Sequence, residues 1–360
     1  MTVCDRRVFY FHGFDPASTA RYRRIFAAAS ERLGVVVDDA TEAEGWLALH
    51  GDTRTWFTYL RYDDLVREAQ RGGLLSRLGR GLRTMMSMQF DGSFGRLPVR
   101  TMGLVAAPFA VAAGALVVAG NLAAELPGVG LALAASVLGV AWYLLLPMKL
   151  ILASDLFAFM RSVARGDWAA EPYEARLPEF AAQIVPEGDE VLVVGHSLGG
   201  IAAIRAVAAR LADWPDDRQI SLLTLGSVHG IVLAQRGPGS DRLADAIAAI
   251  ASDRRVVWVD VSNPRDAFCI PLTDPLLMIE DRAQPDMQSP LVISAPLSRA
   301  PRIPGDRRTL FGAMRRHMGY LLAAPEGAGF DYSDWVTGET TLAERTAGRS
   351  PSPRARMWQR

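Results

Sequence analysis

The feature that most constrains this chain is a long apolar stretch between residues 101 and 148. Between Arg100 and Lys149 the only charged residue is Glu125, which divides the stretch into two runs. A bilayer core about 30 Å thick is crossed by roughly 20 apolar residues in a helix, and each run meets that length. Glycine and alanine are frequent in both runs, and small residues let two helices approach closely in lipid. The sequence therefore predicts a transmembrane hairpin with helices at about 101–122 and 126–150.

The charges that flank the two runs predict how this hairpin is oriented. The connection at 121–128 has no Lys or Arg, whereas both flanks are basic, with Arg77, Arg80, Arg83, Arg96, Arg100, Lys149, Arg161 and Arg165. By the positive-inside rule, both flanks are expected on the cytoplasmic side of a bacterial-type inner membrane. The alternative is a buried helix pair or a hydrophobic cap over an active site. The preceding segment, "LVREAQRGGLLSRLGRGLRTMMSMQF", mixes basic residues with Leu, Met and Phe, as an interfacial helix would.

Outside the apolar stretch, strand patterns alternate with helix patterns. Strands are predicted at 7–11, 190–195, 219–227 and 254–262, a hairpin at 45–64, and helices at 16–34, 173–185, 198–213, 241–252 and 308–324. This alternation predicts an α/β fold with a mostly parallel sheet and helices on both faces. We expect a core formed by 1–68 and 166–335, an insertion at 69–165, and a disordered tail at 336–360.

Composition excludes several other classes of protein. The formal net charge is zero, which argues against nucleic acid as the main partner. Two cysteines, Cys4 and Cys269, give neither a disulfide framework nor a metal-ligand cluster and fit a reducing compartment. The first residues contain no apolar run of the kind found in signal peptides. Because there is also no phosphate-binding loop and no His-x-x-x-His pair, we expect neither a cofactor nor a metal.

One short motif points to chemistry. The apolar run "EVLVV" ends in "GHSLGG", and an Ala-rich helical pattern follows at once. Gly195 and Gly199 permit a very sharp turn from strand to helix, which would hold Ser197 strained and exposed at the carboxyl edge of the sheet. The helix N-terminus behind the serine supplies positive potential toward a developing oxyanion. The alternative is that Ser197 is only a small residue in a tight turn.

The sequence "GHSLGG" after "VLVV" resembles the nucleophile elbow of α/β-hydrolases, especially lipases and esterases. "FYFHGF", at 9–14, resembles their early His-Gly loop, which contributes to the oxyanion hole. The resemblance covers residues up to about 64 and from about 170 to 335, with the membrane segment as an insertion. The chain is also similar to poorly characterised bacterial hydrolases that begin with a "FHGFDP" strand and carry a membrane hairpin before the elbow. The resemblance implies an α/β-hydrolase fold.

In this family the catalytic residues follow the order nucleophile, acid, histidine. Two of the histidines, His229 and His317, follow Ser197, and His229 comes too soon after it. The resemblance therefore implies that His317, in "MRRHMGYLL", is the base, at a helix start or within a helix, whereas many family members carry it on a loop. The alternative is an ordinary histidine on a helix surface beside two arginines.

The acid is expected just beyond the strand at 254–262. Asp266, in "NPRDAF", occupies a loop position after that strand and is the first candidate. Asp274 and Asp260 are alternatives, and an acid elsewhere, such as Asp63 or Asp64, also remains open. A carboxylate is needed because it fixes the histidine tautomer and stabilises the imidazolium that forms during the reaction.

The resemblance also implies the oxyanion hole and the reaction. Its donors would be the amide of Leu198 and one from Gly13-Phe14. We expect a membrane-anchored serine hydrolase on the cytoplasmic side that cleaves lipid or other apolar acyl esters through an acyl-enzyme. The expected partners are the bilayer and an apolar acyl substrate. The alternatives are an acyltransferase or thioesterase with the same triad, or a non-catalytic membrane-bound scaffold.

Overall fold

The computed structural model describes residues 2–16, 19–38, 45–126, 128–146, 150–279, 281–295, 312–324 and 329–350. Within them the protein is an α/β fold whose sheet has eight strands in the order β2-β3-β4-β1-β5-β6-β7-β8. Their bounds are β1 (Asp5–Phe11), β2 (Val36–Asp38), β3 (Gly45–His50), β4 (Thr53–Leu60), β5 (Glu190–His196), β6 (Ile220–Leu225), β7 (Val256–Ser262) and β8 (Leu291–Ser294). Strand β3 is antiparallel to β2 and β4, and the remaining pairs are parallel. The predicted mostly parallel sheet is confirmed.

Strand β5 shows that the sheet is buried on both faces. Val191 and Val193 belong to one apolar cluster, while Leu192 and Val194 belong to another, because successive side chains of a strand point to opposite faces. The first cluster includes helices α2 (Asp63–Ala69), α6 (Ile151–Arg165), α7 (Ala170–Gln183), α8 (Gly199–Arg210), α9 (His229–Gln235) and α10 (Pro238–Ser252). The second includes α1 (Thr19–Ser30), α11 (Gly312–Met318), α12 (Tyr332–Thr337) and α13 (Leu342–Thr346). The predicted covering of both faces is confirmed.

The described residues also form short 3₁₀ helices between the longer elements. They are η1 (Glu31–Leu33), η2 (Phe94–Arg96), η3 (Leu211–Asp213), η4 (Pro275–Met278) and η5 (Gly319–Leu321). The first of them follows α1 and ends at Gly34, which has a φ of 72°, so the predicted helix stop at this glycine is confirmed.

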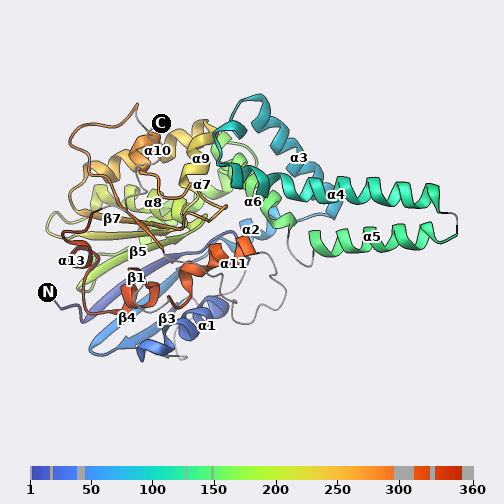
Figure 1. Ribbon diagram of the computed structural model, residues 1–360. Coiled ribbons are helices and arrows are strands. Elements are labelled where there is room, and N and C mark those ends of the chain that lie inside the picture. Colours follow the sequence, from blue (N-terminus) through green and yellow to red (C-terminus); the bar gives the residue numbers. More distant parts are fainter. Residues whose placement is uncertain are drawn as a thin grey trace.

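A helical hairpin projects from the α/β domain. Helices α4 (Val99–Glu125) and α5 (Gly130–Leu145) lie side by side and extend away from the sheet, while α3 (Leu74–Phe90) lies near their base (Figure 1). By length and composition α4 is the one helix among the described residues that could cross a membrane. Helix α5 has 16 residues, or about 24 Å of rise, which is shorter than the predicted 126–150. The structure therefore does not bear out a second helix of spanning length.

The glycines of the hairpin do not have the role that the sequence suggested. A Cβ atom added to Gly114, Gly120 or Gly139 would meet nothing within 4 Å, so these glycines do not face the partner helix. Close approach instead occurs at Gly130, where a Cβ atom would lie 2.0 Å from the carbonyl oxygen of Leu122. The contact that requires glycine is therefore at the tip of the hairpin and not along its length.

The insertion and the tail are more closely integrated with the core than predicted. Helix α6, within the predicted insertion, is buried along most of its length and packs in the same cluster as α8 and α10. The prediction of a disordered tail is wrong for its first part, because 342–346 form α13 with a capping box. The buried Arg6 holds this part by donating hydrogen bonds to the carbonyls of Val336 and Gly338, at 3.1 and 2.8 Å. Residues 351–360 lie outside the described residues.

Candidate active site

The candidate site lies at the carboxyl end of β5, where the chain turns sharply into α8. Ser197 has a φ of 58°, in the left-handed region that residues other than glycine rarely adopt. The turn is held by three backbone hydrogen bonds: the Ser197 amide donates to the carbonyl of Leu225 at 2.9 Å, and its carbonyl accepts from the amides of Gly200 and Val228 at 3.1 and 3.3 Å. Strain that the surrounding structure holds in this way is typical of functional positions.

The glycines around Ser197 are required by packing. A Cβ atom on Gly195 would lie 2.6 Å from the Cα of Gly200, and one on Gly199 would lie 2.2 Å from the carbonyl oxygen of Phe11. A Cβ atom on Gly200 would lie 2.2 Å from the Oγ of Ser227. These contacts bring the start of α8 against the ends of β1 and β6. The motif "GHSLGG" therefore reflects a turn so tight that larger residues would displace its neighbours.

His317 and Asp266 form a buried pair beside this turn. The Nδ1 of His317 lies 2.8 Å from the Oδ2 of Asp266, and both side chains are buried. Asp266 also accepts hydrogen bonds from the hydroxyl of Tyr320 and the amide of Phe268, each at 2.9 Å. Burial alone would raise the pKa of Asp266, but His317 and these donors outweigh it and hold that pKa below its usual range. The carboxylate therefore stays ionised and can fix the proton of His317 on Nδ1.

The other ring nitrogen of His317 is available to the cavity. Its Nε2 is buried and has no hydrogen-bond partner among the described residues. A buried ring nitrogen without a partner costs free energy, which is typical of a group that is paired only when a ligand or reactant is present. His317 is the sixth residue of α11, so the expectation that it lies within a helix is confirmed.

The alternative acids are engaged elsewhere. Asp260, in β7, accepts a hydrogen bond from the hydroxyl of Thr224 at 2.6 Å, and burial raises its pKa to about 7. Asp274 accepts from the amide of Leu276 at 2.9 Å and so caps η4. Asp63 pairs with Arg61 and Arg67, and Asp64 pairs with Arg176. Of the acids considered, Asp266 is the one that the structure brings to His317.

Two of the predicted oxyanion residues line the same cavity as Ser197, and the third follows it in the chain. Gly13 is so close that a Cβ atom there would lie 3.5 Å from the Oγ of Ser197. The next residue, Phe14, is buried, with its ring 5.6 Å from that of Phe159. Leu198 is the N-cap residue of α8, where the amide has no acceptor within the helix. The structure therefore places Gly13 against Ser197, with Phe14 in the lining of the same cavity.

The two histidines next to the elbow are uncharged parts of the framework. Burial lowers the pKa of His12 to about 4, and its ring stacks on that of Tyr62 with centroids 4.1 Å apart. Burial and then the charge of His317 lower the pKa of His196 to about 3. The Nε2 of His196 lies 3.0 Å from the carbonyl oxygen of His317 and so positions the backbone of that residue. Sequence reasoning missed this contact, and also Tyr320, whose position three residues after His317 was the available signal.

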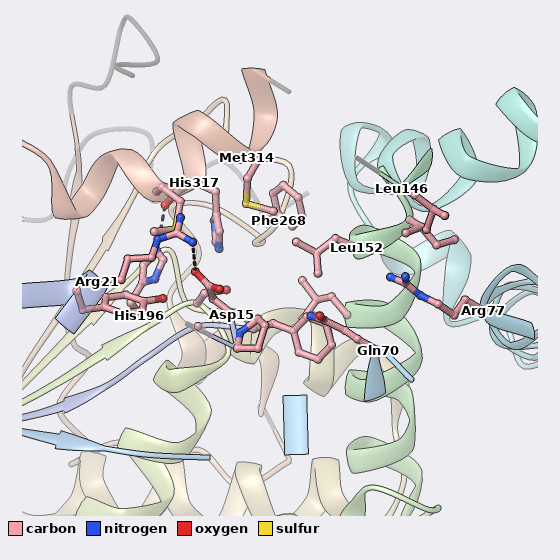
Figure 2. Close-up of a pocket in the computed structure, with 18 residues that line it drawn as sticks. Asp15, Arg21, Gln70, Arg77, Leu146, Leu152, His196, Phe268, Met314 and His317 are labelled. Carbon is pink, nitrogen blue, oxygen red and sulfur yellow. Dashed lines mark hydrogen bonds and ion pairs between the residues drawn. The ribbon is translucent and has the colours of Figure 1, made fainter. Parts of the chain in front are cut away.

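A cavity of about 380 Å³ joins these groups (Figure 2). Ser197, His317, Gly13 and Phe14 line it together with residues from α1, α3, α6 and α11. The contribution of α6 was not foreseen, because its sequence was assigned to the membrane insertion.

Comparisons with known proteins add no family assignment. No protein-family model, no curated protein and no solved structure matches this chain. Within the described parts of the chain, no group of three or more His, Cys, Asp or Glu side chains is placed to hold a metal ion. What the site does must therefore be inferred from its own geometry.

Proposed function

We propose that this protein is a membrane-anchored serine hydrolase of the α/β-hydrolase class that cleaves carboxylic esters of apolar acyl groups. The observation that carries the proposal is the buried pair of Asp266 and His317, whose unpartnered Nε2 shares a cavity with Ser197. A nucleophile, a base and a residue that orients the base are the three parts that acyl transfer requires. The strained turn at Ser197 supports the same assignment.

The reaction follows from these positions. The Nε2 of His317 takes the proton of Ser197 as its Oγ attacks the carbonyl carbon, and Asp266 stabilises the resulting imidazolium. The amides of Leu198 and of the Gly13-Phe14 segment donate hydrogen bonds to the oxyanion, each worth about 3 kcal/mol in the transition state. His317 then returns the proton to the leaving alcohol. Water enters, loses a proton to His317 and releases the acyl group as a carboxylic acid.

The membrane attachment rests on the surface and connectivity of the hairpin. Exposed large apolar residues occur on both helices and include Leu116, Val117, Leu131, Val140 and Trp142. Soluble proteins rarely expose apolar patches of this extent. Strands β1 to β4 precede the hairpin and β5 to β8 follow it in a single sheet, so a chain that enters the bilayer through α4 must come back to the same side. Helix α5 covers about 24 Å of that return path and is by itself shorter than the bilayer core. The basic flanks favour the cytoplasmic side for the sheet.

Helix α3 supports the same placement. Leu75, Leu82, Met86 and Phe90 are exposed and recur at helical spacing along one face. An exposed apolar face close to basic residues is typical of a helix that lies in a membrane interface. We therefore propose that α3 rests on the surface that α4 enters.

The first test is labelling of the full chain in native membranes with a fluorophosphonate probe. We expect wild type to be labelled, Ser197→Ala to lose labelling completely, and His317→Ala to lose nearly all of it. The matched control is Ser136→Ala, since Ser136 lies in α5 and its hydroxyl donates to the carbonyl of Ala132. Labelling that survives in Ser197→Ala would exclude the proposed nucleophile, and an unlabelled but folded wild type would favour a non-catalytic scaffold.

A further inference from the structure

The cavity has a polar end and an apolar end. Figure 2 shows Arg21 and Asp15 beside His317 and His196, and the charged groups of Arg21 and Asp15 lie 3.5 Å apart. The remainder, here called the apolar arm, also contains Gln70 and Arg77, but its lining is mainly apolar, with Leu146, Ile151, Leu152, Leu156, Phe268 and Met314. A site of this kind suits a molecule with one polar and one apolar part.

The apolar arm leads from the serine to the base of the hairpin. Leu146 directly follows α5, and Ile151 and Leu152 are the first residues of α6. In Figure 2 Leu152 points into the cavity between Phe268 and the region of Leu146. On the proposed function this base lies at the bilayer surface, so an acyl chain in the arm extends toward the membrane.

At the far end of the apolar arm, the positive charge of Arg77 is already paired. Arg77 lines this end, but its Nε lies 3.0 Å from the Oδ2 of the fully buried Asp155. A paired guanidinium of this kind is a poor site for a second polar headgroup, since binding one would break a buried ion pair. Gln70 is a further polar group of the lining, and its Nε2 has no hydrogen-bond partner among the described residues. The arm is therefore suited to a mainly hydrocarbon group that can place one acceptor, such as an ester oxygen, near Gln70.

The volume limits how much hydrocarbon can enter. The cavity of about 380 Å³ is shared between the polar end and the apolar arm. The single arm therefore offers room for one acyl chain beside the leaving alcohol. We propose that the substrate is a monoacyl ester, with its acyl chain in the apolar arm and its leaving alcohol at Arg21 and Asp15. Leu152, in the middle of the arm, limits the length of the chain.

This inference rests on the proposed function, and the test separates the two. The full chain in detergent is assayed on p-nitrophenyl esters from acetate to palmitate. We expect kcat/KM to rise by up to about fourfold per added methylene and then to level off once the chain fills the apolar arm. Leu152→Trp should lower the ratio of kcat/KM for the dodecanoate to that for the acetate at least tenfold, whereas Leu152→Ala should extend the range to longer esters. The control is Leu49→Trp, because Leu49 is exposed on β3 outside the cavity.

Several results would overturn the inference. If acetate and dodecanoate react equally in wild type, or if both Leu152 variants keep the wild-type profile, the apolar arm does not hold the acyl chain, while the proposed function stands. Cleavage of a diacylglycerol as fast as a monoacylglycerol in mixed micelles would exclude the monoacyl preference. If wild type neither hydrolyses any ester nor reacts with the fluorophosphonate probe, the proposed function itself fails. If Leu152→Trp does not fold, the shift expected for Leu152→Ala decides the question.

Discussion

The elbow and the hairpin are both rich in glycine, but the structure uses this residue differently in the two regions. At the elbow, Cβ atoms on Gly195 and Gly199 would lie 2.6 and 2.2 Å from neighbouring atoms. In the hairpin, Cβ atoms on Gly114 and Gly139 would meet nothing within 4 Å. Glycine content therefore indicates close packing only where the surrounding elements converge. At the elbow, packing requires that particular Cβ atoms be absent. In the hairpin, glycine is not required by packing, and what characterises the region is its apolar surface.

The largest expected effect is at the buried pair. Asp266→Asn should lower kcat about 10⁴-fold with the fold retained, because an amide no longer fixes the tautomer of His317 or stabilises its positive charge. The matched control is Asn121→Ala in the hairpin, where the side-chain amide donates only to the carbonyl of Val117 in the same helix. Ester hydrolysis at saturating substrate measures both. A drop of less than tenfold for Asp266→Asn would contradict the role of this residue.

The different roles of glycine at the elbow and in the hairpin can be tested by replacing one glycine with alanine in each region. Gly199→Ala should reduce the free energy of unfolding by about 1–3 kcal/mol and abolish labelling of Ser197, because the added methyl group overlaps the carbonyl of Phe11. Gly114→Ala should be neutral or stabilise by up to about 1 kcal/mol, since alanine favours the helix and the site is open. Thermal unfolding in detergent measures both changes. Equal effects of the two substitutions would remove the distinction between the regions.

Lowering the pH should reduce the free energy of unfolding of the α/β domain. His12, His196 and His229 are buried, and burial is the main cause that lowers their pKa values to about 4, 3 and 4 from 6.5. Below pH 6.5 the unfolded chain therefore binds protons that the folded chain does not. The free energy of unfolding should fall between about pH 6.5 and 4, by up to about 1.4 kcal/mol per pH unit and histidine. Asp260, whose pKa burial raises to about 7, acts in the opposite direction over this range and offsets about one histidine.

Unfolding midpoints measured between pH 7.5 and 4.5 check this dependence. His229→Gln should reduce the slope by about half, since it removes one of three histidines and Asp260 already offsets another. An unchanged slope would show that His229 is protonated in the folded state.

Much of the fold was predictable because its signals are local. The run 190–195, the glycines after it and the helical pattern beyond them lie within a few turns of one another, and they form β5 and α8. The charge-free runs likewise predicted the long apolar helix α4, whereas the second run forms α5, which is shorter than predicted. Composition misled where a tertiary contact outweighed it: α6 is part of the core, and Arg6 holds a tail expected to be disordered.

The sequence by itself determined the class of fold, the turn that presents Ser197 and the apolar character of the hairpin, because each depends on residues close together in the chain. Only the tertiary structure decided that Asp266, and not Asp260 or Asp274, lies against His317. It also decided that the cavity at Ser197 reaches the base of the hairpin. The reason is physical: a loop after β7, a helix near residue 317 and the start of α6 meet only when the sheet has assembled. No local pattern encodes the distance between them.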